Sequence, residues 1–288
     1  MEITAGVVKQ LREKTGVGMM ECKSALVEAK GDLSEAEKIL RKKGLAAAAN
    51  KAGRATGEGI IATAASADAA VLIELNCETD FAARGADFQG LVKAAVDTAL
   101  AKGAPTEGSA PTDAAREALL DAPSSSGRPL RQTIGEAVGK IGENMQLRRY
   151  VKFQKSAPGS VLASYIHTGG KIGVLVEAES ASGPVGEALL RDLAMHIAAA
   201  APRYVTRDEV SPKVLADEQE IARDQALKAG KPAQVVEKIV AGRIDKFLGE
   251  VTLVEQAFVK DPDKTVKQLL GDGVRVRRFA RFVLGEGL

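Results

Sequence analysis

The sequence predicts an α+β protein, with a small helical N-terminal domain followed by a duplicated core of sheet and helix. Two observations lead to this prediction. Apolar residues recur at helical spacing through residues 1–54, and the spacing then changes to the alternation that is typical of strands. Two strands followed by a helix then occur twice along the chain, and Val71 to Glu74 can be aligned with Val174 to Glu177.

Three short helices are expected in the N-terminal domain. Thr4 can cap the first helix, Gly31-Asp32 separates the second from the third, and Gly44 is expected to end the third. A bundle of this size is only marginally stable alone. The Ala/Gly/Lys-rich stretch 46–59 is interpreted as a hinge or a helical linker.

The two core halves share one pattern. In the first, we expect strands at 60–63 and 71–75, a helix capped by Asp87, helices at 114–120 and 130–141, and a strand at 145–153. In the second, we expect strands at 161–167 and 172–177, a helix at 186–200, and an inserted antiparallel helical hairpin. The expected boundaries are 1–54 for the N-terminal domain, 55–159 and 160–210 for the core halves, 211–247 for the hairpin, 248–263 for a return to the core, and 264–288 for a short C-terminal module.

Composition excludes several classes of protein. The 288 residues include 40 Lys and Arg against 38 Asp and Glu, a net charge of +2, which argues against binding of nucleic acid mainly through bulk charge. The N-terminus lacks the apolar run of a signal peptide, and no stretch approaches the roughly 20 apolar residues of a membrane span. Two cysteines, Cys22 and Cys77, give neither a disulfide framework nor a zinc motif. We expect a cytoplasmic protein that needs no cofactor and binds no membrane.

Motifs for catalysis are missing from the sequence. His167 and His196 are the only histidines and have no metal-binding spacing, and no serine-nucleophile or phosphate-loop motif occurs. Gly169-Gly170-Lys171 is interpreted as a hairpin turn, because no helix N-terminus follows it. These observations favour a binding protein over an enzyme.

The segment Leu75 to Arg84 stands out, and two interpretations of it are open. A buried strand ends there, three polar residues follow, and Phe81 precedes a turn of small residues. In one interpretation Thr79 or Asp80 caps a turn and Phe81 folds back into the core, which the residues alone favour. In the other, Phe81 is an exposed aromatic wedge beside the Asp80 carboxylate, an anchor for a pocket on another protein.

Several separated strings of sequence together resemble one family, elongation factor Ts of bacterial translation. The resemblance covers the whole chain, and the strings occur in the family's order. They are Thr-Gly-Val-Gly-Met-Met-Glu-Cys-Lys at 15–23, Asn-Cys-Glu-Thr-Asp-Phe at 76–81, Ile-Gly-Glu-Asn at 141–144, Tyr-Ile-His at 165–167, Met-His at 195–196, Gly-Lys-Pro at 230–232 and Phe-Val-Leu-Gly-Glu-Gly at 282–287.

The resemblance implies a fold and an activity. The fold has an N-terminal domain of the ubiquitin-associated type, a duplicated α+β core, an inserted helical hairpin and a C-terminal module. The activity is guanine-nucleotide exchange on elongation factor Tu, in its GDP-bound and nucleotide-free forms, without catalytic chemistry on the factor and without direct contact to nucleic acid. Such a factor needs only to bind the nucleotide-free partner more tightly than the loaded one.

The resemblance also implies partner-binding residues. Phe81 would be the wedge, with Asp80 and Thr79 beside it, and His167 would touch another domain of the partner. A helix of the partner would meet the residues Arg12, Met19, Met20 and Lys23. Four of these residues have a simpler alternative: Met19 in the core, Arg12 and Lys23 as solvated charges, and His167 as an inert surface residue.

Two positions depart from the family's pattern, and two other functions remain as alternatives. Ala82 stands where a bulkier residue is more usual, and Ala257 replaces a proline, which puts partner contacts from Val259 and Lys260 in doubt. An RNA-associated protein could use the basic N-terminal domain and the basic run at 275–281, although the net charge is close to zero and stacking aromatics are scarce. A nucleotide-using enzyme could use Gly169-Gly170. The oligomeric state is open, including a homodimer through the second core half or the hairpin.

Overall fold

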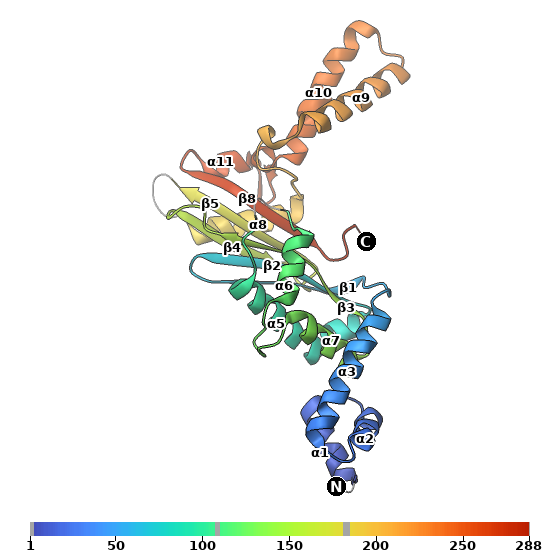
Figure 1. The fold of residues 1–288 in the computed structure, drawn as a ribbon. Coiled ribbons are helices and arrows are strands. Elements are labelled where there is room, and N and C mark those ends of the chain that lie inside the picture. Colours follow the sequence, from blue (N-terminus) through green and yellow to red (C-terminus); the bar gives the residue numbers. More distant parts are fainter. Residues whose placement is uncertain (1–2, 107–109, 181–184, 288) are drawn as a thin grey trace. The chain divides into compact units, whose positions relative to one another are not determined.

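The computed structural model describes residues 3–106, 110–180 and 185–287, and Figure 1 shows its helices and strands. The chain divides into two compact units. The first unit consists of residues 1–154, 168–173 and 282–288, and the second of residues 155–167 and 174–281. Helices and strands are mixed in both units, which confirms the predicted α+β class.

Three helices form the N-terminal bundle: α1 (Ala5–Thr15), α2 (Met19–Glu28) and α3 (Leu33–Lys51). The Thr4 side chain accepts a hydrogen bond from Val7 N and begins α1, as predicted, and Asp32 does the same for α3 through Glu35 N at 2.9 Å. The buried side chains that close the bundle include Val8, Leu11, Cys22, Ala25, Leu26, Ala36 and Leu40.

The prediction that Gly44 ends the third helix is wrong. Helix α3 continues to Lys51 because it packs along α7 (Leu130–Ile141), where Gly44 meets Gly139. A Cβ atom added to Gly139 would lie 2.6 Å from the Gly44 Cα atom, so only glycine permits this close approach. Arg41 and Glu136 form an ion pair of 3.2 Å across the same helix pair. Packing therefore overrides the weak helical propensity of glycine.

The first sheet is antiparallel and has the order β1 (Glu58–Ala65), β2 (Ala69–Cys77), β3 (Met145–Gln154). Every residue of the central strand β2 is buried. Its core includes side chains from α5 (Ala86–Lys102), α6 (Asp113–Asp121) and α7. Asp87 does not cap α5, contrary to the prediction. The helix begins after Gly85, and the Asp87 carboxylate pairs with Lys140 Nζ at 2.5 Å.

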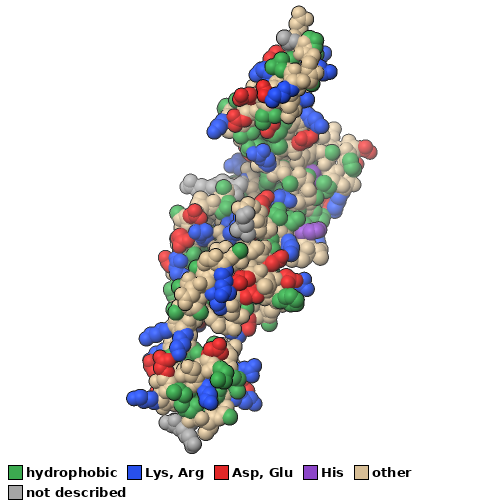
Figure 2. All heavy atoms as spheres, turned by 90° about the vertical axis from the view of Figure 1, so that its right-hand side faces the viewer, with side chains coloured by type: hydrophobic (Ala, Val, Ile, Leu, Met, Phe, Trp, Pro, Cys, Tyr) green, Lys and Arg blue, Asp and Glu red, His purple; other side chains and the backbone are tan. Residues whose placement is uncertain are grey.

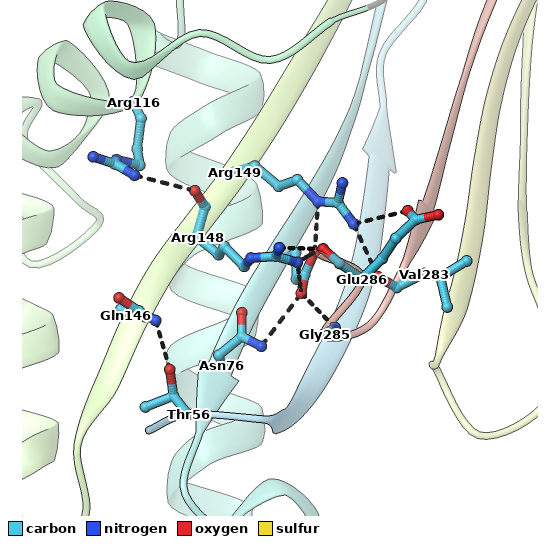
Figure 3. Close-up of polar contacts among 10 residues, drawn as sticks. Thr56, Asn76, Arg116, Gln146, Arg148, Arg149, Val283, Gly285 and Glu286 are labelled. Carbon is cyan, nitrogen blue, oxygen red and sulfur yellow. Dashed lines mark hydrogen bonds and ion pairs between the residues drawn. The ribbon is translucent and has the colours of Figure 1, made fainter. Parts of the chain in front are cut away.

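A buried carboxylate lies in the middle of this sheet. Glu74 on β2 is fully buried and accepts hydrogen bonds from Arg149 Nε at 2.6 Å and Arg148 Nη1 at 2.9 Å (Figure 3). Adjacent strand residues normally point to opposite faces, but the register of β3 shifts opposite Glu74 and Leu75, so both arginines reach one carboxylate. The backbone N–H of Gly285 also donates to Glu74 at 2.9 Å.

The second sheet repeats this plan in the order β4 (Ser160–Ile166), β5 (Ile172–Ser180), β8 (Val274–Val283). Helix α8 (Glu187–Ala200) follows β5 as α5 follows β2. Glu177 on the central strand is fully buried and accepts a hydrogen bond from Arg278 Nε at 2.7 Å. Each sheet thus has a buried glutamate on its middle strand and an arginine on its third strand, which confirms the duplicated core.

The remaining elements lie between β5 and β8, except for α4, which follows β2. Helices α9 (Pro212–Lys228) and α10 (Ala233–Val251) form the predicted antiparallel hairpin, with Ala222, Ala226, Val236 and Val240 buried between them. The others are α4 (Asp80–Arg84), two 3₁₀ helices (Arg207–Glu209 and Leu253–Glu255), β6 (Ala257–Phe258), β7 (Asp261–Thr265) and α11 (Val266–Leu270).

His196 on α8 connects this helix to the segment 256–259 within the second unit. Its ring is fully buried, with Nε2 3.0 Å from Gln256 Oε1 and Nδ1 3.3 Å from Val259 N. Because Nδ1 accepts a hydrogen bond from the backbone N–H of Val259, the proton of the ring is on Nε2. This N–H donates a hydrogen bond to Gln256 Oε1, and the imidazole is neutral. Burial lowers the pKa of His196, although the hydrogen bond to Gln256 opposes this shift.

The close contact between α3 and α7 predicts opposite effects on stability for two glycine-to-alanine variants. Gly139→Ala should destabilise the protein by about 1–3 kcal/mol, because the new methyl group meets backbone rather than a movable side chain. Gly90→Ala, on α5 with nothing within 4 Å, should instead stabilise it by about 0.5–1 kcal/mol. Thermal unfolding followed by circular dichroism measures both. Equal shifts for the two variants would contradict the close contact.

The lowered pKa of His196 predicts that the unfolding free energy of the protein depends on pH. The folded-state pKa lies below the unfolded value of about 6.5, so the unfolded state takes up the proton first as the pH falls. The stability from this site is therefore present above about pH 6.5 and lost below it. The difference in unfolding free energy between the wild type and His196→Gln should shrink between pH 7.5 and pH 5. A difference that stays constant would contradict this, and His167→Gln serves as the control for loss of a histidine.

Candidate partner-binding site

Phe81 is the most exposed large apolar side chain among the described residues, with 83% of its surface accessible. It lies on α4, which Thr79 caps by accepting a hydrogen bond from Ala82 N at 3.2 Å. Ala83 on this short helix packs into the core. Phe81 lies two positions earlier, on the opposite side of the helix, and therefore points outward. The interpretation that Phe81 folds into the core, which the residues alone favoured, is therefore wrong.

Asp80 lies beside Phe81 on the same helix. Its carboxylate pairs with Arg84 Nη2 at 3.0 Å, and the two side chains are 44% and 80% exposed. An exposed pair of this kind contributes little to stability. Thr79, Asp80 and Phe81 thus form one small exposed surface, in which an aromatic ring stands next to a carboxylate.

The backbone before α4 is held by Glu143, just after α7. Glu143 Oε2 accepts hydrogen bonds from Glu78 N at 3.1 Å and from Thr79 N at 3.0 Å. Glu143 Oε1 accepts the Thr79 hydroxyl at 2.6 Å. No local pattern of residues points to Glu143 as part of this site. The signal that could have found it is the string Ile-Gly-Glu-Asn at 141–144, which carries part of the resemblance.

Glu78 and Asn144 add further hydrogen bonds between the segment before α4 and the loop after α7. Here the acceptor lies before α4 and the donor lies after α7. Glu78 Oε1 accepts a hydrogen bond from Asn144 N at 2.6 Å, and Arg54 Nη1 lies 3.4 Å from the same oxygen. The Asn144 backbone N–H and the Arg54 charge lower the pKa of Glu78, so this carboxylate stays ionised. The Asn144 side chain donates to the carbonyl oxygen of Arg54 at 2.9 Å. The two strings at 76–81 and 141–144 are therefore in direct contact.

Cys77 lies beneath this surface and is fully buried. Its thiol donates to the carbonyl oxygen of Thr79 at 3.1 Å. Burial, together with the Glu143 carboxylate, raises the pKa of Cys77 to about 12. The thiol is thus protonated at neutral pH, and it serves as a packing group under α4.

The N-terminal bundle carries a second exposed surface on α2. Met20 is 74% exposed, Met19 41% and Val27 58%, and Lys23 is exposed between them, whereas the opposite face of α2 is buried. These four positions lie within about 100° around the helix. Figure 2 shows hydrophobic side chains among basic ones over this bundle, at the bottom of the view. Met19 is therefore not a core residue, and Arg12 is exposed on α1 of the same bundle.

His167 belongs to the second unit and is exposed where β4 ends. Its Nδ1 atom lies 3.0 Å from the Tyr165 hydroxyl, and the two rings are tilted against each other. Of the predicted contact residues, the structure therefore places Thr79, Asp80 and Phe81 on one surface. Arg12, Met19, Met20 and Lys23 lie on the bundle of the same unit.

Within residues 3–106, 110–180 and 185–287, no three His, Cys, Asp or Glu side chains come together in a way that could hold a metal ion. In the part of the chain that the structure describes, no helix has both the length and the apolar content needed to cross a membrane.

Comparison with known proteins decides the family. The family model described as Elongation factor TS matches residues 78–286. A protein named elongation factor Ts from Trichlorobacter lovleyi is 46% identical over 100% of this chain and 94% of its own length. The chain belongs to the elongation factor Ts family. Relatives of the same name are 48% identical in Syntrophotalea carbinolica, over 100% of this chain and 95% of theirs, and 44% identical in Clostridium botulinum, over 99% and 94%.

The Cys77 thiol gives a test of how firmly α4 covers the core. At pH 7.5 iodoacetamide should alkylate Cys77 at least about a hundredfold more slowly in the native protein than in urea, because both burial and the raised pKa oppose reaction. Mass spectrometry of peptides measures Cys77 and Cys22 separately. Rapid alkylation of native Cys77 would show that α4 does not cover it.

Proposed function

We propose that this chain binds elongation factor Tu in the cytoplasm and accelerates the release of GDP from it, so that GTP can reload. The observation that carries the proposal is the 83% exposed Phe81, held beside Asp80 on a capped helix in a chain of the elongation factor Ts family. An exposed aromatic side chain on a rigid support suits a pocket on another protein.

Exchange of this kind needs no catalytic chemistry on the chain. Binding of the factor and binding of the nucleotide to the partner oppose each other, and each weakens the other by the same factor. Phe81 would act by entering between helices of the GTPase domain and disturbing the groups that order the magnesium ion and the phosphates. The chain then supplies a contact in place of a nucleophile or a base, and we infer that it is not an enzyme.

The other residues have supporting roles in this proposal. Asp80 adds a hydrogen-bond acceptor beside the wedge, and Thr79 holds the helix that presents it. The Met19–Lys23 surface of α2, with Arg12, contacts a helix of the GTPase domain. Two neighbouring exposed methionines are suited to this because their side chains adapt to the surface that they meet. His167 contacts a further domain of the partner.

The basic run at 275–281 does not favour an RNA-binding function. Arg278 donates to the buried Glu177, Arg277 pairs with Glu179 at 3.3 Å, and Arg281 Nε donates to the carbonyl oxygen of Ala198. Three of the four arginines in this run therefore have partners inside the second unit. Their charges serve the fold, and a phosphate backbone would have to compete with carboxylates and a carbonyl group.

The proposal predicts that two phenylalanine variants behave oppositely. Phe81→Ala should leave the melting temperature nearly unchanged and slow stimulated GDP release roughly 30-fold or more, since loss of an interface anchor commonly costs about 2 kcal/mol. Phe88→Ala, which removes a fully buried side chain on α5, should lower stability by about 3–5 kcal/mol.

The measurement is release of fluorescent GDP from elongation factor Tu with catalytic amounts of each variant. Asp80→Ala should slow release less than Phe81→Ala, because the steric wedge remains. Full exchange activity of a folded Phe81→Ala variant would refute the role of Phe81 as the wedge. Wild-type protein that has no effect on GDP release would refute the proposed function itself.

A further inference from the structure

We propose that Glu143 is a positioning residue for the exchange activity, and that its carboxylate fixes the direction in which α4 presents Phe81. The inference rests on the proposed function, because it concerns how the wedge is held. Glu143 does not belong to the exposed surface around Phe81 and acts through the backbone of Glu78 and Thr79.

Helix α4 cannot hold Phe81 by itself. It has only five residues, Asp80–Arg84, and isolated helices much shorter than about 12–15 residues are unstable in water. The Phe81 ring is 83% exposed, so its own packing does not fix it either. An anchor that is ordered before binding loses less entropy on binding than a mobile one. The order must therefore come from the groups that hold the start of α4.

The two oxygens of Glu143 hold this start at three points. Oε2 accepts the backbone N–H groups of Glu78 and Thr79, while Oε1 accepts the Thr79 hydroxyl hydrogen at 2.6 Å. With its hydrogen turned toward Glu143, the Thr79 oxygen has lone pairs free to accept Ala82 N at 3.2 Å. Glu143 thus orients the cap residue itself, which lies two positions before Phe81.

Glu143 is in turn fixed on both sides. Gly142 ends α7 with a φ of +88°, and its carbonyl oxygen accepts a hydrogen bond from Lys51 Nζ at 2.6 Å. Asn144 donates its backbone N–H to Glu78 and its side chain to the carbonyl oxygen of Arg54. The loop 142–144 therefore ties the end of α3, the segment after it and the start of α4 to one another, which makes Glu143 a firm support.

The first experiment measures the support without the partner. In full-length Glu143→Ala, alkylation of Cys77 should become about tenfold faster or more, for two reasons. Lost hydrogen bonds to a charged group let α4 open locally, and loss of the Glu143 charge also lowers the raised pKa of Cys77. Alkylation of Cys22 in the N-terminal bundle should not change. Glu143→Gln also removes the charge but keeps one acceptor oxygen, so the excess rate of Glu143→Ala over Glu143→Gln measures the local opening alone. Equal rates in these two variants would overturn the proposal. Unchanged Cys77 alkylation in Glu143→Ala would overturn the proposal, as would an equal increase at both cysteines.

A matched control tests whether loss of any paired glutamate gives this result. Glu117 on α6 makes comparable side-chain contacts, to Arg116 and Arg131, and none of its hydrogen bonds involves residues 77–84. Glu117→Ala should leave the alkylation of Cys77 and the stimulated release of GDP at the wild-type values. An increase in Cys77 alkylation equal to that in Glu143→Ala would overturn the specific role of Glu143.

The second experiment is a double-mutant cycle in the GDP-release assay. Glu143→Ala should slow stimulated release about tenfold in the wild-type background and have almost no effect when Phe81 is already alanine, because it acts through Phe81. An equal factor in both backgrounds would overturn the positioning role. If wild-type protein does not stimulate release, the proposed function fails, and the alkylation experiment still decides whether Glu143 holds α4.

Discussion

The fold depends on a buried charge in the middle of each sheet. Glu74 and Glu177 are fully buried on the central strands, where an unpaired carboxylate would be very unfavourable. Removing the partner of a buried ion pair typically costs about 3–5 kcal/mol, so each sheet requires the arginines of its third strand. Those strands, β3 and β8, lie far from the central strands in sequence. The carboxylates therefore select which distant segment completes each sheet and in which register.

The sequence predicted the elements well because most of them carry their own local signal. Val71 to Glu74 and Val174 to Glu177 aligned correctly, since buried central strands read as continuous apolar runs. The strand at 145–153 was also predicted, but its pairing was not, because the contact of Glu74 with Arg148 and Arg149 depends on a local shift in register. The end of α3 was mispredicted for a related reason. Gly44 has a low helical propensity, and only its meeting with Gly139 explains why the helix continues.

For the candidate site, too, the sequence does not predict contacts between residues that are far apart in the chain. From the residues alone, a phenylalanine after a buried strand is expected to return to the core, and it was the resemblance that favoured the alternative of an exposed Phe81. Its direction is set by the phase of a five-residue helix, and that phase depends on Thr79 and Glu143, which are 64 residues apart. Local periodicity contains no information about such a contact. The exposed face of α2 was easier to anticipate, because Met20 and Lys23 follow a helical period within one segment.

The hydrogen bond from Gly285 to Glu74 also has a consequence for synthesis of the chain. The two residues are 211 positions apart, and translation proceeds at about 5–20 residues per second. Roughly 10–40 s therefore pass between the synthesis of Glu74 and that of Gly285, one of the donors to its carboxylate. During that interval Glu74 relies on water or on its remaining partners. The first unit reaches its final hydrogen bonding only late in translation, even though its N-terminal bundle emerges first.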